Sequence, residues 1–204
     1  MAQLSAELEA QFLADDSPEE FSLADVLELA GERTFGFLFV LLSLPSALPV
    51  PAPGYSVPFG ILLGWLGVQM ALGSDQPWLP KVWRSQSIGR ERLSGIINAA
   101  LPWLRKLEVL SRPRLVSICK SPPGRMGLGI AVAIMGLSMI APIPGTNTLP
   151  AMGIFVVGLG LIDDDGAIAL LGATGGVVVT VSIWTAIIWG GSNLVELLKK
   201  GLGQ

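Results

Sequence analysis

The sequence predicts an all-α integral membrane protein, with an internal repeat of broken or re-entrant helices at Pro-x-Pro breaks and a C-terminal transmembrane helix. Three observations support this prediction. Hydrophobic residues make up 51% of the 204 residues and charged residues only 14%, whereas an ordinary soluble domain carries about 25% charged residues. Apolar segments alternate with clusters of proline and glycine. One apolar–break–apolar pattern occurs twice in the chain.

Residues 1–32 are expected to form an acidic, amphipathic cytoplasmic arm. Nine acids and no base lie between Glu7 and Glu32. Apolar residues at helical spacing predict helix here, and Ser22 with Asp25 has the S-x-x-D pattern of a helix start. No basic stretch leads into an apolar run, so a secretory signal peptide is not expected. The internal apolar segments are therefore expected to direct insertion.

Residues 33–73 are predicted to form the first broken-helix unit. The apolar segment Thr34–Leu44 ends at Pro45, a Pro/Gly cluster follows, and Val57–Leu72 is apolar again. Spanning a bilayer takes about 20 helical residues, so neither segment is long enough alone. Short helices around such a break favour a re-entrant hairpin or a discontinuous helix, whose irregular backbone must be buried in protein or line a wet cavity.

Residues 74–125 are expected to form basic helices in the cytoplasm or at the membrane interface. Ten of the thirteen bases and only two acids lie between Lys81 and Arg125. Tryptophans among these charges favour an interfacial location over the alternative, a small soluble helical hairpin. The surplus of bases predicts the cytoplasmic side, and anionic lipid headgroups are possible partners of residues 81–125.

The C-terminal part contains a second unit and a longer apolar segment. Residues 126–166 are predicted to form the second broken-helix unit, and residues 167–204 a terminal transmembrane helix and tail. Ala167–Trp189 contains no charged residue and is long enough to span. The run Asp163-Asp164-Asp165 is interpreted as a stop-transfer signal and solvated turn, in preference to a cation site.

The two units match at an offset of 93 residues without a gap. The matching positions are Pro49-Val50-Pro51 with Pro142-Ile143-Pro144, Gly60 with Gly153, Leu66-Gly67 with Leu159-Gly160, and Gly73 with Gly166. Duplicated broken helices occur in many transporter folds, whose sites form where the breaks meet. Duplication for symmetric packing alone is the equal alternative. With no convincing span between the copies, a parallel arrangement is favoured over an inverted one.

Two glycine pairs predict close helix packing. Gly60 with Gly64 and Gly172 with Gly176 each form a G-x-x-x-G sequence that places both glycines on one helix face. Another helix can approach such a face closely.

The polar residues beside the two breaks are the candidate substrate-binding site. Helix starts after a break present unpaired N–H groups that favour anions. The predicted site residues are Pro49, Pro51, Tyr55, Ser56, Pro142, Pro144, Thr146 and Asn147. For Ser56 and Asn147, capping of their own helices is the favoured interpretation, and substrate binding is the alternative.

Composition excludes several chemistries. The chain has no histidine and one cysteine, Cys119, so no metal site, disulfide or cofactor is expected. No nucleotide-binding motif occurs, and no nucleic-acid partner is expected. The sequence offers no pairing of a nucleophile with a general base that would argue for an enzyme. No ionisable residue lies within an apolar segment, which argues against a proton relay.

A family resemblance follows from two blocks of residues. The first comprises Leu44-Pro45, Pro49-Val50-Pro51, Gly60, Gln69, Leu72-Gly73 and Pro77-Trp78-Leu79-Pro80, and the second comprises Pro142-Ile143-Pro144, Asn147, Pro150 and Gly158 through Gly166. These blocks resemble the ExoD-type exopolysaccharide synthesis membrane proteins. The resemblance implies a location in the bacterial cytoplasmic (inner) membrane, in several passes, and a link to exopolysaccharide production. It implies no particular reaction.

Three functions are therefore compared. The first is a membrane protein that supports bacterial exopolysaccharide synthesis or export without catalysis of its own. The alternative is a small transporter or channel for an ion or anionic solute, with its site at the paired Pro-x-Pro breaks. The third and weakest is an enzyme that acts on a lipid-linked sugar. The expected partners are the lipid bilayer, the exopolysaccharide machinery and a second copy of the chain.

Overall fold

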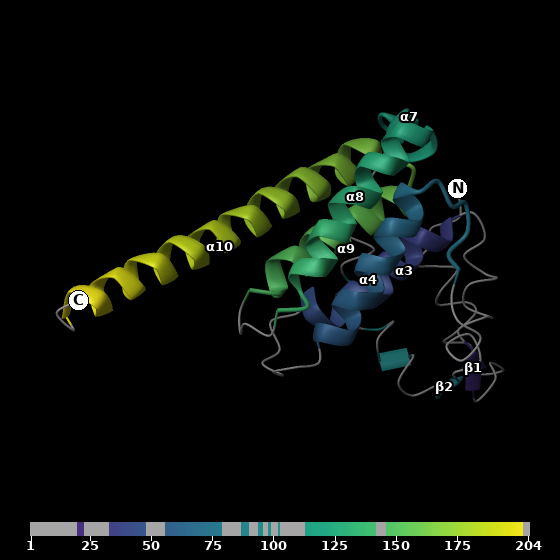
Figure 1. The fold of residues 1–204 in the computed structure, drawn as a ribbon. Coiled ribbons are helices and arrows are strands. Elements are labelled where there is room, and N and C mark those ends of the chain that lie inside the picture. The colour runs from purple at the N-terminus through teal and green to yellow at the C-terminus, as the bar shows by residue number, and fades with distance from the viewer. Residues whose placement is uncertain are drawn as a thin grey trace.

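The computed structural model describes residues 20–22, 33–47, 56–78, 87–89, 113–141 and 146–201, with the single positions 94, 95, 98 and 102. Its elements are β1 (Glu20–Ser22), α3 (Thr34–Ala47), α4 (Ser56–Ala71), β2 (Ser87–Gly89), α7 (Val116–Lys120), α8 (Pro122–Ser138), α9 (Thr148–Ile162) and α10 (Gly166–Gly201). The described part is thus helical apart from one short ladder of strands (Figure 1).

That ladder corrects the all-α prediction at one point. β1 and β2 pair antiparallel, with Phe21 opposite Ile88 and Ser22 opposite Ser87. Ser22 therefore lies in a strand, and the predicted helix start at this residue is wrong. The rest of the 1–32 arm and most of the 74–125 segment lie outside the described residues.

Helix boundaries follow the apolar segments, with two corrections. α3 continues through Pro45 to Ala47 instead of ending there. Proline cannot donate the backbone hydrogen bond to the residue four positions earlier, and the helix ends two residues after it. α8 begins at Pro122, before the predicted start at Met126. Gly124 N donates to Ser121 Oγ at 3.3 Å, so Ser121 caps a helix whose first position is proline.

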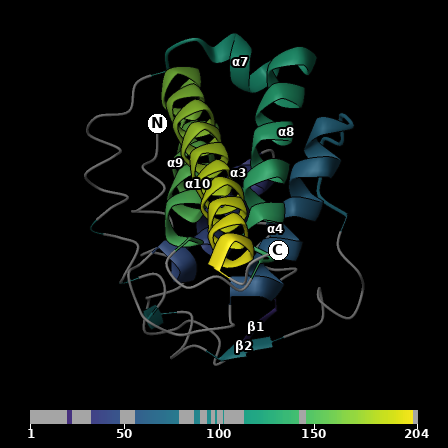
Figure 2. The same cartoon turned by 60° about the vertical axis from the view of Figure 1, so that its left-hand side comes forward.

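Four helices of 14 to 17 residues pack in two antiparallel pairs, α4 against α8 and α3 against α9. The first turns of α4, at Gly60, lie on the last turns of α8, at Met139. In the same way, Gly36 near the start of α3 lies on Ile162 at the end of α9. The starts of α3 and α8 and the ends of α4 and α9 therefore share one end of the bundle (Figures 1 and 2).

Glycine makes these close contacts possible, as the two G-x-x-x-G pairs predict. A Cβ on Gly60 would lie 2.9 Å from the carbonyl oxygen of Gly136 in α8. A Cβ on Gly172 would lie 2.7 Å from Val157 N in α9. Both distances are shorter than real Cβ contacts, so larger residues would push the helices apart.

α10 is the longest helix and extends well past the others (Figures 1 and 2). Its segment Gly166–Gly190 is, among the described residues, the one helix long and apolar enough to cross a membrane by length and composition. An 18-residue window of this segment has a mean hydropathy of 1.9, and 33% of that window is buried. At 1.5 Å per residue, the whole of α10 measures about 54 Å.

Apolar side chains lie on the outside of the bundle as well as in its core. The core is formed by buried residues such as Phe39, Leu63, Met135 and Ile154. The exposed large apolar residues of α4, α8, α9 and α10 include Ile61, Trp65, Val68, Met126, Ile130, Ile134, Leu137, Leu149, Met152, Leu170, Leu171, Val178, Val181, Trp184, Ile187, Ile188 and Trp189. A monomeric soluble protein rarely exposes so large an apolar surface.

Candidate functional site

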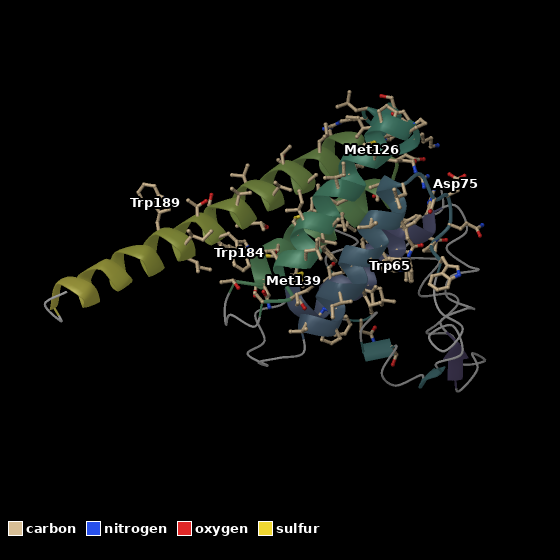
Figure 3. All side chains as sticks on the ribbon, viewed as in Figure 1. Trp65, Asp75, Met126, Met139, Trp184 and Trp189 are labelled. Atoms are coloured by element: carbon tan, nitrogen blue, oxygen red, sulfur yellow. The ribbon has the colours of Figure 1, made fainter. Side chains whose placement is uncertain are left out.

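Charged side chains gather at one end of the bundle, which we call the charged end. α3, α4 and α9 contain no charged residue, α8 contains only Arg125 in its first turn, and α10 is uncharged from Ala167 to Val195. The charged residues beside these helix ends are Arg33, Asp75, Arg114, Lys120, Arg125, Asp163, Asp164 and Asp165. Figure 3 shows Asp75 and Met126 at this end, away from Met139 and Trp184.

Arg125 connects three helices at the charged end. Its Nη2 donates to the carbonyl oxygen of Ser74 at 2.9 Å, just beyond α4. Its guanidinium carbon lies 6.0 Å from the centre of the Phe35 ring in α3, within cation–π range. Asp75 Oδ1 is 3.9 Å away, but the Asp75 side chain is 96% exposed. Exposed pairs of this kind contribute little, so the guanidinium is positioned mainly by the carbonyl and the ring.

α7 and the start of α10 are tied together beside Arg125. Lys120 Nζ lies 3.0 Å from Asp164 Oδ2, and Gly166 N donates to the carbonyl oxygen of Arg114 at 2.7 Å. These contacts place the Lys120 ammonium group at the same end of the bundle as the Arg125 guanidinium.

Asp165 has a structural role that the sequence analysis missed. Its carboxylate is fully buried and accepts hydrogen bonds from Ala167 N at 3.0 Å and Ile168 N at 3.2 Å. It therefore caps α10, where the helix dipole also favours a negative charge. The interpretation of the aspartate run as a solvated turn is wrong for Asp165.

A pocket of about 590 Å³ opens between these groups, and we call it the charged-end pocket. Its lining residues are Arg33, Phe35, Gly36, Met70, Asp75, Gln76, Cys119, Lys120, Arg125, Leu161 and Asp164. Phe35, Met70 and Cys119 are buried and form an apolar floor. The basic side chains come from the starts of α3 and α8 and from the end of α7. The volume is within the usual range for small-molecule sites, about 300–1,000 Å³.

Cys119 is not suited to act as a nucleophile in this pocket. Its Sγ lies 3.6 Å from the carbonyl oxygen of Gly160. Burial raises the pKa of the thiol from its ordinary value of 9.0 to about 11, and the carboxylates of Asp164 and Asp165 add to the shift. The reactive species is the thiolate, so Cys119 stays protonated and inert at neutral pH.

The predicted site at the breaks is only partly within the described residues. Pro49, Pro51, Tyr55, Pro142 and Pro144 lie outside them, as does the side chain of Ser56.

Thr146 and Asn147 are described, just before α9. Thr146 Oγ1 donates to Asn147 Oδ1 at 3.4 Å. Asn147 occupies the N-cap position of α9, but its side chain makes no capping hydrogen bond. The capping alternative is therefore wrong for Asn147 in this structure.

The end of the bundle opposite the charged end is called the break end. Three hydroxyl groups lie around a small cavity there. The cavity has a volume of about 10 Å³ and is lined by Ser138, Thr146, Pro150, Thr180, Ile183, Trp184 and Ile187. Ser138 and Thr180 donate to carbonyl oxygens of their own helices at 2.6 and 2.7 Å. The space suits about one water molecule. Sequence reasoning did not place Ser138 and Thr180 in the site, although hydroxyls in apolar helices were a usable signal.

Comparison with known proteins identifies the family. The chain matches the family described as "Exopolysaccharide synthesis, ExoD" over residues 4–185. The chain belongs to the ExoD family. It is 45% identical over 205 residues to an uncharacterized protein of Synechocystis sp., covering 99% of this chain and 97% of the relative. No solved structure matches this chain.

A second relative carries the family's name. The chain is 31% identical over 148 residues to Protein ExoD of Rhizobium meliloti, covering 71% of this chain and 61% of the relative. The match to the ExoD family extends over both ends of the bundle, from Arg33 to Trp184. The resemblance noted from the sequence is thereby confirmed, and the family points to a role in exopolysaccharide synthesis.

Proposed function

We propose that this protein is a multi-pass component of the bacterial inner membrane that supports exopolysaccharide synthesis or export without catalysing a reaction itself. The observation that carries the proposal is the separation of charge. Charged side chains gather at one end of the described bundle, while α10 continues uncharged from Ala167 to Val195. Family membership supplies the process.

The separation of charge supports insertion into lipid. An uncharged stretch of this length exceeds the roughly 20 helical residues needed to span a bilayer. The exposed apolar residues of α4, α8 and α10 would then face lipid tails. α3, α4, α8 and α9 measure only about 21–26 Å at 1.5 Å per residue, so they would enter from the charged end as re-entrant hairpins. The breaks would then lie deep in the membrane, where protein must surround them.

Several further features support the non-catalytic part of the proposal. The chain has no histidine, and its one thiol is buried with a raised pKa.

In the proposed membrane location, the basic 81–125 segment would contact anionic headgroups on the cytoplasmic side. Exopolysaccharide machinery, or a second copy of the chain, would be the protein partner.

Two measurements test this proposal: exopolysaccharide output and resistance to an alkaline carbonate wash. For both, the chain is expressed in a bacterium whose own ExoD-family gene has been deleted. We expect output to be restored and the protein to stay in the membrane fraction after an alkaline carbonate wash. Release of the protein by carbonate would contradict the membrane assignment. If the protein is stably inserted but exopolysaccharide output stays at the level of the deletion strain, the supporting role is contradicted.

A second candidate function, transport of an ion or anionic solute at the two breaks, is favoured by polar groups at the break end. The hydroxyl of Ser46, near the end of α3, is buried and makes no hydrogen bond to any described residue. The Asn147 side chain is not used as a cap. The matching antiparallel pairs α4–α8 and α3–α9 support two parallel copies of one hairpin, with both breaks at the same end. Flux through liposomes that contain the purified protein tests this candidate, and the absence of flux for a panel of ions rejects it.

A further inference from the structure

The charged-end pocket carries one cation that is not engaged elsewhere. Arg33 precedes α3, is exposed, and makes no hydrogen bond or ion pair within the described part of the chain. No described residue therefore uses the N–H donors of its guanidinium. A guanidinium presents a planar fork of N–H groups that matches the oxygens of a phosphate.

Two further cations line the same pocket, held from different directions. Lys120 is placed at the end of α7 by Asp164, and Arg125 is placed by Ser74 and the Phe35 ring. Each uses only part of its donor capacity on these partners, because an ammonium group has three N–H donors and a guanidinium has five. Both therefore retain donors that can bind an anion.

Carboxylates at this end reduce the positive charge without cancelling it in the pocket. The lining holds three cations and two carboxylates, which leaves a formal surplus of one positive charge. Asp75 is almost fully exposed, so water screens it. The Asp165 carboxylate is buried but accepts two N–H groups at the start of α10. The pocket thus favours an anion of low charge.

The surroundings of the pocket indicate a membrane interface. Leu72, Leu115 and Met126 are exposed at this end, and Trp78, whose backbone is bound by Gln69 in the last turns of α4, is exposed as well. Exposed tryptophan beside basic residues is typical of the headgroup region of a bilayer. Phosphate groups are concentrated there, and the apolar floor of Phe35 and Met70 gives an attached lipid moiety a surface to contact.

We propose that the charged-end pocket binds a phosphate group carried by an amphiphile, with Arg33, Lys120 and Arg125 as its ligands. The ligand class comprises anionic phospholipids and other lipid-linked phosphates. Free inorganic phosphate offers the same phosphate oxygens without the lipid. The preference for a lipid-borne phosphate rests on the proposed membrane location, whereas the phosphate site itself rests on the geometry of the pocket.

Native mass spectrometry of the full chain, purified in a neutral detergent, tests this proposal. The probes are dioctanoyl phosphatidylglycerol, dioctanoyl phosphatidylcholine and inorganic phosphate. We expect saturable binding of phosphatidylglycerol and weaker binding of the zwitterionic lipid. Arg33→Gln is expected to raise the Kd for phosphatidylglycerol about tenfold, since it removes charge-assisted hydrogen bonds. Arg33→Lys, which keeps the charge, is expected to restore part of the affinity.

Arg114→Gln is the matched control, because Arg114 is exposed at the same end of the bundle but does not line the pocket. Equal losses in the Arg33 and Arg114 variants would show general charge attraction and overturn the site. Equal binding of both lipids, or no saturable binding of any probe, would also overturn it. Binding of inorganic phosphate as tight as that of the lipid, lost in Arg33→Gln, would retain the phosphate site and overturn its assignment to an amphiphile.

This experiment can fail independently of the proposed function. Binding is measured in detergent and requires neither membrane insertion in the cell nor exopolysaccharide output. A protein that restores exopolysaccharide but binds no phosphate would contradict only the pocket proposal.

Discussion

The side chain of Gln69 holds both backbone groups of Trp78. Gln69 Oε1 accepts a hydrogen bond from Trp78 N at 2.6 Å, and Gln69 Nε2 donates to the Trp78 carbonyl oxygen at 3.0 Å. The chain reaches this position through a turn at Gly73, whose φ of 85° suits glycine. The amide of Gln69 thus fixes the segment after α4 and keeps Trp78 at the charged end. This accounts for two residues on which the family resemblance rested.

Replacing Gln69 tests this clamp. Gln69→Leu removes both hydrogen bonds and leaves two partly buried backbone groups of Trp78 without their partner. We expect the free energy of unfolding to fall by about 1–3 kcal/mol, visible as a lower Tm in detergent. Gln69→Glu keeps an acceptor for Trp78 N but has no donor, so its Tm is expected to lie between those of Gln69→Leu and the original protein. A Gln69→Leu protein as stable as the original would contradict the structural role.

Glycine at the α4–α8 contact gives a second prediction. A Cβ on Gly67 would lie 2.5 Å from Ala133 N, which is backbone and cannot move aside cheaply. Gly67→Ala is therefore expected to lower stability by about 1–3 kcal/mol. Gly175 of α10 has no atom within 4 Å of its Cβ position. Gly175→Ala is the matched control and is expected to gain up to about 1 kcal/mol from helix propensity. Thermal unfolding of both variants in detergent compares them directly, and similar losses in both would rule out this packing.

The sequence predicted the helices well but not how they pair. Apolar segments and Pro/Gly clusters located α3, α4, α8, α9 and α10 because those features act locally. The pairing of α4 with α8 and of α3 with α9 depends on contacts between distant segments. Helices that are apolar on all sides give no face by which to choose partners.

The charged-end pocket was missed for a related reason. Its residues, such as Arg33, Asp75 and Lys120, lie far apart in sequence, and only the antiparallel packing brings them together. One signal was available: Arg33 and Arg125 each stand directly before an apolar segment. The burial of Asp165 could not be inferred, because three successive aspartates look like a solvated turn until one of them caps a helix.

The thiol of Cys119 gives a prediction that depends on pH. Because its pKa is raised to about 11 and the side chain is 5% exposed, maleimide is expected to label it at pH 8 only after denaturation. The folded chain keeps the proton between pH 9 and 11, where the unfolded chain would lose it. The stability linked to neutral Cys119 is therefore fully present below about pH 9 and is lost as the pH rises towards 11. Cys119→Ala is expected to show a smaller loss over this window, measured by thermal unfolding.

The orientation of the charged end needs an exposed label, since Cys119 is buried. We expect Arg114→Cys, in a Cys119→Ala background, to react with a membrane-impermeant maleimide only after the cells are permeabilised. The reason is the cytoplasmic preference of basic segments near membrane helices. Labelling of Arg114→Cys in intact cells would place the charged end outside. A cytoplasmic protein with an engineered thiol, probed in the same cells, controls for leakage.

Asn147 distinguishes a functional break from a structural one. Its side chain accepts a hydrogen bond from Thr146 and makes none to the first turn of α9. A substitution there should therefore cost little stability, although loss of a true N-cap costs about 1 kcal/mol. We expect Asn147→Leu, which removes the amide at similar size, to abolish exopolysaccharide support while membrane levels and Tm stay normal. Asn98→Leu makes the same change at an exposed asparagine and is expected to have no effect. A lower Tm with active surviving protein would return Asn147 to a capping role. Normal exopolysaccharide from a stable Asn147→Leu protein would count against any site at the second break, because a binding amide in so apolar a region cannot be replaced by a hydrocarbon without loss.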